Sequence, residues 1–304
     1  MTAQIIDGRV EADKLLAEVR LGVGELRRDA GVVPCLAVVF VGDDPASEIY
    51  VRSKTQLATA VGIRSVKHLL PASASQGELL ELIDALNEDP AIHGILVQLP
   101  LPPHISADSV LNRILREKDV DGFHPTNAGS LAVGKPTIVP CTPLGCLRLV
   151  KSVRADLTGL DVVVVGHSRI VGRPAAQVFL NENCSVTVTH KESRDVPGYC
   201  READILVVAV GRPHLIKGDW IKPGATVIDV GINRMASGDA GRIVGDVEFG
   251  AALRVAGAIT PVPGGVGPMT VAALMSNTVA CAKGLVSLSG LDAAHGAKGE
   301  TVFV

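Results

Sequence analysis

Short apolar segments alternate with amphipathic segments along most of the chain. The apolar segments predict β-strands at residues 35–41, 64–69, 93–98, 161–165, 185–190, 205–210, 225–230 and 256–260. Apolar residues at helical spacing predict helices at about 11–29, 44–61, 75–88, 106–113, 143–153, 172–182 and 199–203, and a long last helix from about 268. Strands that are apolar on both faces must be covered on both sides, so the pattern predicts an α/β fold with parallel sheets.

The alternation breaks at residues 120–142, where Gly and Pro are frequent. After this break, the segment from about 160 to 260 has the pattern of a complete doubly wound unit. We therefore expect two domains with a cleft between them. Residues 1–142 and 268–304 would form a catalytic α/β domain with a parallel sheet, and residues 143–267 a Rossmann-like dinucleotide-binding domain.

The composition excludes several classes of function. The 304 residues are 47% hydrophobic and 20% charged, with a formal net charge of −3, and their rings are limited to five Phe, two Tyr and one Trp. Proteins that bind single-stranded nucleic acid stack bases on aromatic side chains within a basic surface, so we expect no nucleic-acid partner. The apolar runs are too short to span a bilayer, and the first residues do not form a secretory signal. We expect a cytoplasmic protein without membrane contact.

The cysteine pattern argues against a metal site. The chain has six cysteines and no C-x-x-C pair. Cys141 and Cys146 have the spacing C-x4-C, but no second pair of Cys or His follows nearby to complete a zinc site. We expect reduced thiols, mostly packed in the core, and no bound metal.

A glycine-rich turn follows the strand at 161–165 and opens a helix. The two glycines, Gly166 and Gly172, are separated by five residues, which matches neither the dinucleotide fingerprint G-x-G-x-x-G nor a Walker A motif. Such a turn directs backbone N–H groups toward a phosphate. Many α/β proteins use a similar turn only for packing, so its position in a βαβ unit favours nucleotide binding without deciding it.

Basic residues near this turn indicate which dinucleotide would bind. In NAD-binding folds the second strand usually ends in an acid that binds the ribose 2′-hydroxyl, whereas basic residues suit a 2′-phosphate. Here the strand is followed by His190 and Lys191, and Arg169 lies in the turn. NADP is therefore favoured over NAD, the alternative being an ordinary solvated loop. Ile232, after another strand, has either backbone contact with a nicotinamide or a place in a simple turn.

The helix predicted at 44–61 has a lysine on its apolar face. Tyr50, Lys54, Leu57 and Val61 are spaced so that they share one side of the helix. Burial disfavours the charged form of a lysine, which makes Lys54 a candidate for proton transfer. The alternative is that Lys54 reaches water or pairs with an acid.

Three other segments place polar groups beside apolar strands or glycine loops. Gln98 is the single amide at the end of the strand 93–98, Asp121 lies in a predicted Asp-Gly turn, and the loop 260–268 contains three glycines before a helix. Each could serve a ligand. Each also has a structural interpretation, as a surface amide, as turn chemistry or as the entry to a helix.

Together these segments resemble the bifunctional methylenetetrahydrofolate dehydrogenase/methenyltetrahydrofolate cyclohydrolase family. The resemblance runs from Ile5-Ile-Asp-Gly8 to about Gly290. The motifs that carry it are Tyr50-Val-x-x-Lys54, Gly94-Ile-Leu-Val-Gln98-Leu-Pro-Leu-Pro, Lys118-Asp-Val-Asp-Gly-Phe123, Pro140-Cys-Thr-Pro143, Gly172-Arg-Pro174 and Pro261-Val-Pro-Gly-Gly-Val-Gly-Pro-Met-Thr270.

The resemblance implies two reactions of one-carbon metabolism that occur in one cleft. These are the NADP-linked oxidation of 5,10-methylenetetrahydrofolate to the methenyl cation, and the hydrolysis of that cation to 10-formyltetrahydrofolate, a purine precursor. Lys54 is implied as the key catalytic group, which helps water to attack the methenyl carbon. Gln98 would hold that lysine and tune its readiness to give up a proton. Tyr50 would pack on the folate, and Asp121 would accept from the pterin ring.

The family also implies the rest of the site and a homodimer. The implied substrate site comprises Tyr50, Gln98, Leu99, Asp121, Pro263, Gly264 and Gly265, and the implied cofactor site comprises Gly166, His167, Ser168, Arg169, Lys191 and Ile232. At two contacts to the 2′-phosphate the chain departs from the family, with His167 in place of Arg and Lys191 in place of Ser. Lys191 and Arg169 are available to compensate.

Two rival hypotheses remain on sequence grounds. One is a related two-domain dehydrogenase that resembles shikimate dehydrogenase and lacks cyclohydrolase activity. The other is a folate- or nucleotide-binding module without catalysis. Loss of hydrolysis on replacing Lys54 would discriminate the first hypothesis from both rivals.

Overall fold

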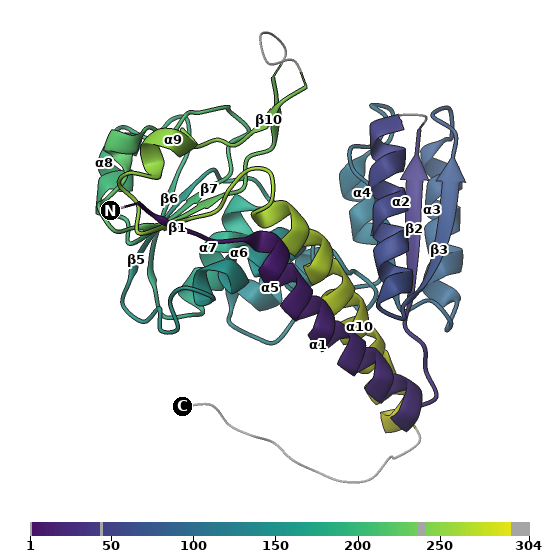
Figure 1. Cartoon of the computed structure of the whole chain (residues 1–304). Coiled ribbons are helices and arrows are strands. Elements are labelled where there is room, and N and C mark those ends of the chain that lie inside the picture. The colour runs from purple at the N-terminus through teal and green to yellow at the C-terminus, as the bar shows by residue number, and fades with distance from the viewer. Residues whose placement is uncertain (1, 43–44, 236–240, 293–304) are drawn as a thin grey trace.

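Two parallel sheets, each covered by helices on both faces, form the molecule (Figure 1). The computed structural model describes residues 2–42, 45–235 and 241–292, with the side chains of 45–52 and 286–292 left aside. One sheet has the strand order β3-β2-β4 and the other the order β1-β11-β8-β7-β5-β6. This confirms the predicted two-domain α/β fold. In the described part of the chain, no helix combines the length and the apolar character needed to cross a bilayer.

The smaller sheet is centred on β2, which is buried along its whole length. Strand β2 (Cys35–Val41) pairs in parallel with β3 (Arg64–Leu70) and β4 (Gly94–Val97). Alternate residues of β2 enter two different cores, as the two-residue period of a strand requires. Helices α3 (Gln76–Glu88) and α4 (Ala107–Arg113) cover one face, and α2 (Pro45–Ala60) lies on the other with α1 and α10.

The larger sheet has the doubly wound arrangement expected of a dinucleotide-binding unit. Its strands are β5 (Asp161–Val165), β6 (Ser185–Thr189), β7 (Ile205–Val208), β8 (Thr226–Asp229), β11 (Ala258–Ile259) and β1 (Gln4–Ile5), all parallel. The covering elements are α6 (Cys141–Lys151) and α7 (Gly172–Leu180) on one face, and α8 (Val196–Glu202), the 3-10 turn η1 (Gly218–Trp220) and α9 (Phe249–Ala252) on the other.

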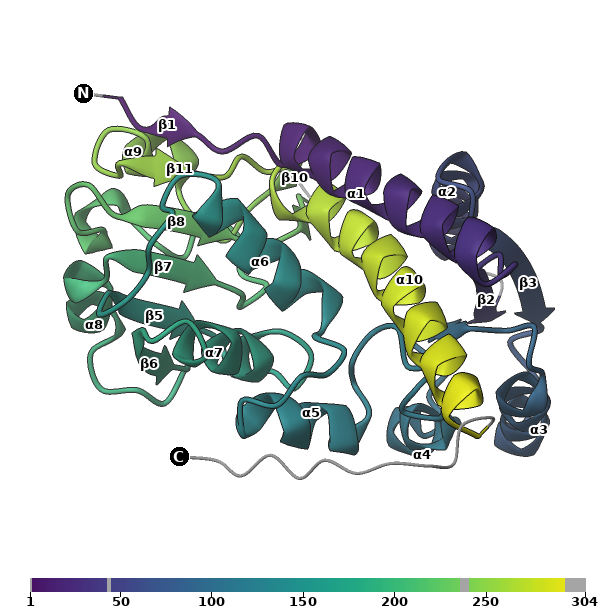
Figure 2. The same ribbon diagram turned by 90° about the horizontal axis from the view of Figure 1, so that it is seen from below.

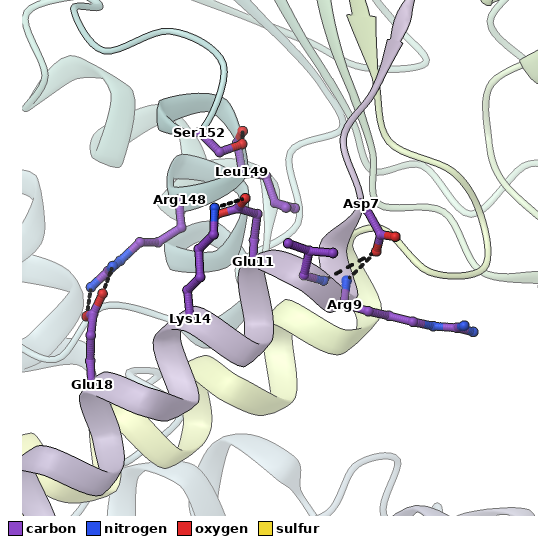
Figure 3. A network of polar contacts seen from close by, with 9 residues as sticks. Asp7, Arg9, Glu11, Lys14, Glu18, Arg148, Leu149 and Ser152 are labelled. Carbon is purple, nitrogen blue, oxygen red and sulfur yellow. Dashed lines mark hydrogen bonds and ion pairs between the residues drawn. The ribbon is translucent and has the colours of Figure 1, made fainter.

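Two long helices connect the sheets. Helix α1 (Gly8–Asp29) and helix α10 (Val266–Asp292) lie side by side in both views and extend from the larger sheet to the smaller one (Figures 1 and 2). The carboxylate of Asp7 caps α1 by accepting from the N–H groups of its first turn. Figure 3 shows Arg148 of α6 reaching Glu18 of α1, at 2.8 and 2.9 Å. The two sheets are therefore joined by packed helices as well as by the chain.

Most of the predicted elements are present, and the misses are short. Helix α5 (Pro125–Ala132) lies inside the segment 120–142, where we predicted only a break, because its Pro is at the first helical position and starts the helix instead of ending one. Strand β1 and the antiparallel pair β9 (Asn233–Arg234) and β10 (Ile243–Val244) were also missed. Two-residue strands have no periodicity to detect.

The domain boundaries at 142 and 267 stay a prediction. The structure adds one difference, since Gln4 and Ile5 pair with Ala258 and Ile259 in the larger sheet. The first strand of the chain therefore belongs with the 143–267 unit, although the helix that follows it leads to the other.

Candidate active site

Lys54 and Gln98 meet at the carboxyl edge of the smaller sheet. Lys54 is half-buried on α2, and its Nζ donates to Oε1 of Gln98 at 2.9 Å. Gln98 directly follows β4, and its own amide nitrogen donates to the carbonyl of Leu99 at 2.8 Å. This second bond orients the amide, so that its oxygen and not its nitrogen faces the lysine. The predicted pairing of Lys54 with Gln98 is confirmed as a contact.

Asp121 lies near Lys54 and is partly shielded from water. Burial raises the pKa of its carboxyl to about 6, while the nearby charge of Lys54 opposes the increase. The thiol of Cys141 donates to Oδ1 of Asp121 at 3.8 Å. Asn277 of α10 supports the thiol, because its Nδ2 lies 3.5 Å from Sγ of Cys141 and also donates to two backbone carbonyls. Asp121 is thus a carboxylate whose charge changes close to neutral pH.

Lys118 and Asp119 stabilise the backbone before Asp121. Lys118 is only 4% exposed, and its Nζ donates to the carbonyls of Leu86, Asn87 and Asp89 at the end of α3, at 3.0, 2.7 and 2.8 Å. Asp119 is buried and accepts from the N–H groups of Gly122 and His124 and from the side chain of Asn127. They fix the turn on which Asp121 stands.

The predicted substrate loop and the predicted nicotinamide contact face one pocket. This pocket, of about 320 Å³, has in its wall the segments 229–232 and 261–268 together with Arg9 and Ser53. Pro263, Gly264, Gly265 and Ile232 therefore come together, as expected of a cleft between the two units. Arg9, whose side chain extends away from α6 (Figure 3), and Ser53, one residue before Lys54, were not predicted from the sequence.

Glycine is required where the substrate loop meets α1. The N–H of Gly8 donates to the carbonyl of Gly264 at 2.9 Å, and a Cβ on Gly8 would lie 1.7 Å from the carbonyl oxygen of Gly265. Gly264 itself has a φ of +107°, which favours glycine. The loop and the start of α1 are therefore in direct backbone contact.

The glycine-rich turn after β5 is closely packed at both of its glycines. Gly166 has a φ of +119°, and a Cβ there would lie 2.2 Å from the carbonyl oxygen of Ala209. A Cβ on Gly172 would lie 2.1 Å from the carbonyl oxygen of Gly166. Ser168 accepts from the N–H groups of Val171 and Gly172 at the start of α7. Both glycines are needed for the turn to close.

A pocket of about 490 Å³ borders this turn. Its lining includes Gly166, His167, Ser168, His190 and Lys191, and it continues over the loop 209–212. The rings of His167 and His190 lie with their centroids 4.7 Å apart. Lys191 is exposed at the rim, with Glu192 3.4 Å away. The structure thus gathers four of the predicted cofactor residues in one place.

Arg169 is placed differently from the prediction, whereas Leu99 and Tyr50 stay predicted substrate contacts. Arg169 reaches across to α4 and forms an ion pair with Asp108, instead of facing the pocket beside Lys191. Leu99 is half-buried and presents its carbonyl to Gln98. Tyr50 belongs to α2, one turn before Lys54, but its side chain lies outside the described residues. Within the described chain, no three His, Cys, Asp or Glu side chains are arranged to hold a metal ion.

Comparisons with known proteins match the chain over nearly its whole length. Residues 6–121 match the model of the tetrahydrofolate dehydrogenase/cyclohydrolase catalytic domain, and residues 140–285 match the model of the corresponding NAD(P)-binding domain. The bifunctional protein FolD of Methylorubrum extorquens is 64% identical over 285 residues, which cover 94% of this chain and 93% of that protein. FolD of Phenylobacterium zucineum is 57% identical over 297 residues, 95% of this chain and all of that protein.

Solved structures agree with these matches. The bifunctional FolD enzyme of Campylobacter jejuni has 46% sequence identity and a TM-score of 0.89, covering 93% of this chain and 99% of its own. The methylenetetrahydrofolate dehydrogenase-cyclohydrolase of Trypanosoma brucei, solved with NADP and an inhibitor, has 40% identity and a TM-score of 0.87, covering 95% of this chain and 99% of its own.

Proposed function

This chain belongs to the tetrahydrofolate dehydrogenase/cyclohydrolase family, and on that premise we propose that Lys54 carries the hydrolytic half of its chemistry. The protein is a bifunctional enzyme that oxidises 5,10-methylenetetrahydrofolate with NADP and hydrolyses the methenyl product to 10-formyltetrahydrofolate. Its substrates are one-carbon derivatives of tetrahydrofolate. The observation that supports the role of Lys54 is its contact with the oriented amide of Gln98.

The hydrolysis needs one proton carrier at the methenyl carbon. Water adds its oxygen to that carbon, and one proton leaves the attacking water. The bond from this carbon to the ring nitrogen N5 then breaks with its electron pair going to N5, which takes up a proton. The remaining hydroxyl loses its proton as its oxygen becomes the carbonyl of the formyl group, so that one proton is released overall. A single amine beside the carbon can accept the first proton and return one to N5. Lys54 is half-buried beside Gln98, which limits the directions in which its Nζ can point.

Asp121 is proposed to bind the pterin ring. Its half-buried carboxylate lies close enough to Lys54 to interact electrostatically, and the pterin edge presents N–H donors. Burial strengthens a hydrogen bond between a carboxylate and such donors. Pro263, Gly264 and Gly265, in the wall of the pocket beside Ser53, would contact the substrate, and Tyr50 and Leu99 stay predicted contacts.

The cofactor residues fit a phosphate-bearing dinucleotide. When bound, NADP is the two-electron oxidant of the dehydrogenase reaction. The N–H groups of residues 167–170 would hold its pyrophosphate, because those of Gly166, Val171 and Gly172 already donate to Thr189 and Ser168. His167 and Lys191, which share one pocket, would bind the 2′-phosphate, and Ile232 would bound the nicotinamide end. We propose that Arg169 contributes less than Lys191, because Asp108 already engages it.

We also propose a homodimer in the cytoplasm that binds neither nucleic acid nor membrane. Strand β6 is the last in its sheet, so one of its edges is open, and Val188 on it is 37% exposed. An open edge with an apolar side chain is suited to pairing with a second copy. All six cysteines are free and buried, as is usual where thiols are kept reduced. Sedimentation of the purified protein at the mass of one chain would contradict the dimer.

Lys54→Gln tests the catalytic proposal. We expect hydrolysis of the methenyl compound to fall by about 100-fold or more, the contribution usual for a positioned proton carrier. NADPH formation from the methylene compound should continue, so the methenyl product should accumulate and be visible by its absorbance. The matched control is Lys14→Gln, which removes an exposed lysine paired with Glu11 on α1. Unchanged hydrolysis by Lys54→Gln would refute the proposal.

A further inference from the structure

Two buried aspartates interlock behind the cofactor-facing edge of the larger sheet. Asp229 ends β8 and is 3% exposed, and Asp246 follows β10 and is fully buried. Neither carboxylate has a cation as its partner among the hydrogen bonds and ion pairs of the described residues. Instead, both are satisfied almost entirely by backbone N–H groups, which is how a buried carboxylate fixes the course of a chain.

The carboxylate of Asp229 holds the two segments that surround it. Its Oδ1 accepts from the N–H groups of Gly231 and Asp246, and its Oδ2 from that of Val247, each at 2.9 Å. The backbone N–H of Asp229 donates to the hydroxyl of Thr260. Asp229 therefore joins the loop after β8 to the segment that carries the second aspartate.

The carboxylate of Asp246 holds a third segment. Its Oδ2 accepts from the N–H groups of Val210 and Gly211 at 2.7 and 2.9 Å. Its Oδ1 accepts from the N–H of Arg212 at 2.8 Å and from the side-chain amide of Asn233 at 2.8 Å. Three successive backbone N–H groups after β7 thus end on one side chain that comes from a different part of the sequence.

A glycine makes room for each carboxylate. A Cβ on Gly231 would lie 2.4 Å from Cγ of Asp246, and a Cβ on Gly245 would lie 1.9 Å from Oδ2 of Asp229. The sequences Asp229-Val-Gly231 and Gly245-Asp246 are therefore reciprocal, since each supplies the aspartate that sits over the glycine of the other. We name these two pairs of residues the aspartate brace.

The aspartate brace connects the two pockets assigned to the cofactor. Val210 and Arg212 line the pocket that contains His167 and Lys191. Gly231 and its neighbours line the pocket formed with the loop 261–268. One side chain, that of Asp246, is bonded both to the loop 210–212 and, through Asn233, to the loop after β8.

We infer that Asp246 is a positioning residue that holds both cofactor-binding loops in their binding geometry before NADP arrives. The inference rests on the proposed placement of NADP over these two loops. A loop that is already ordered loses less entropy when the ligand binds, so the affinity for the ligand is higher. Asp246 is fully buried, so it acts on the cofactor through backbone groups and not by contact.

Asp246→Asn tests this role with little change in shape. An amide has an N–H₂ group in place of one carboxylate oxygen. At least one backbone N–H of the loop 210–212 would then point at another donor instead of an acceptor. We expect the KM for NADP to rise by roughly tenfold or more, the loss that accompanies an unmatched charge-assisted hydrogen bond. Cyclohydrolase activity should keep its kcat and KM, because that reaction uses the Lys54 site and consumes no NADP.

Asp204→Asn is the matched control. Asp204 lies at the amino ends of the strands of the same sheet, where it accepts from the N–H of Asp161 and from Lys222. Its replacement should lower thermal stability without a selective effect on NADP. An equal fall of both activities in Asp246→Asn, or the same rise of the KM for NADP in Asp204→Asn, would overturn the inference.

Hydrogen exchange tests the aspartate brace even if Asp246→Asn folds poorly. In the unmodified enzyme without NADP, the amide protons of Val210, Gly211 and Arg212 should exchange slowly. Exchange as fast as that of an open loop would overturn the inference. Slow exchange, combined with an unchanged KM for NADP in a folded Asp246→Asn variant, would overturn it as well. Failure of the proposed cofactor placement is recognised separately, by a Lys191→Gln variant whose KM for NADP does not change.

Discussion

The amide oxygen of Gln98 lies 2.9 Å from the Nζ of Lys54, and the carbonyl of Leu99 fixes which end of the amide faces the lysine. A neutral acceptor holds an amine in place without adding a negative charge. A carboxylate at the same position would favour the ammonium form instead. The identity of residue 98 therefore bears directly on whether Lys54 can carry a proton.

Gln98→Glu should weaken hydrolysis while keeping the geometry. We expect cyclohydrolase activity at neutral pH to fall by roughly ten- to a hundredfold, and its pH profile to move to higher pH, because the new carboxylate stabilises the protonated amine. The measurement is the rate of loss of methenyl absorbance between pH 6 and 9. Gln56→Glu, an exposed change on the same helix, is the control. A Gln98→Glu enzyme with the unmodified rate and profile would contradict this role.

Asp121 should make both substrate use and stability depend on pH near 6. The pKa of its carboxyl is raised to about 6, chiefly by burial. Substrate binding needs the carboxylate, so kcat/KM for the methylene compound should fall as the pH drops below about 6. In Asp121→Asn, kcat/KM should be low at every pH and should lack this limb. A limb that persists in the variant would assign it to another group.

The same raised pKa has the opposite consequence for folding. A carboxyl whose folded-state pKa lies above its ordinary value of 3.8 stabilises the protein at low pH and loses that contribution as the pH rises through about 6. Asp121→Asn removes the charge of this half-buried carboxyl, so it should stabilise the protein at pH 8 by about 2 kcal/mol and change little at pH 4. Urea denaturation at the two pH values measures the difference. A variant that is less stable at pH 8 would contradict the expectation.

Lys191 should discriminate NADP from NAD. It stands at the rim of the pocket that contains His167 and His190, where a 2′-phosphate would bring two negative charges. Lys191→Gln should raise the KM for NADP by about five- to tenfold, the value of one charge-assisted contact at an exposed site. The KM for NAD should stay the same. Lys217→Gln, an exposed lysine paired with Glu248 elsewhere in the same unit, should change neither value.

Lys118 should matter for stability more than for chemistry. Its ammonium is the donor for three backbone carbonyls at the end of α3. Lys118→Met keeps the length of the side chain but removes the donor of these carbonyls, of which that of Leu86 is buried, at a cost of about 1–3 kcal/mol of unfolding free energy. Denaturant unfolding of Lys118→Met against Lys67→Met, which changes an exposed lysine of β3, measures the cost. Equal stability of the two variants would refute it.

The sequence predicted Lys54 because its signal is local. Lys54 and Leu57 recur at helical spacing, and a charge on such a face is visible without any knowledge of the fold. Gln98 was visible for a similar reason, as a single amide at the end of an apolar strand. The family resemblance supplied the roles, while the contact between the two side chains came from the structure.

The remaining site residues could not be predicted because their signals are not local. Asp246 follows a two-residue strand, and its partners Val210, Gly211 and Arg212 lie more than thirty positions earlier in the chain. Lys118 precedes the predicted Asp-Gly turn, and nothing local in the sequence indicates its burial; it is 4% exposed because α3 ends against it. Partners of this kind are set by how strands are ordered in a sheet.

The pairing of Gln4 with Ala258 has a consequence for how the enzyme is made. Strand β1 has no partner in the larger sheet until Ala258 and Ile259 have been synthesised, and a pairing over so long a stretch of chain is of the kind that slows folding. A fragment cut to residues 143–267 would lack this strand and would expose the edge of β11 to other chains. The cofactor-binding unit of the folded protein is therefore not encoded by one continuous segment of the sequence.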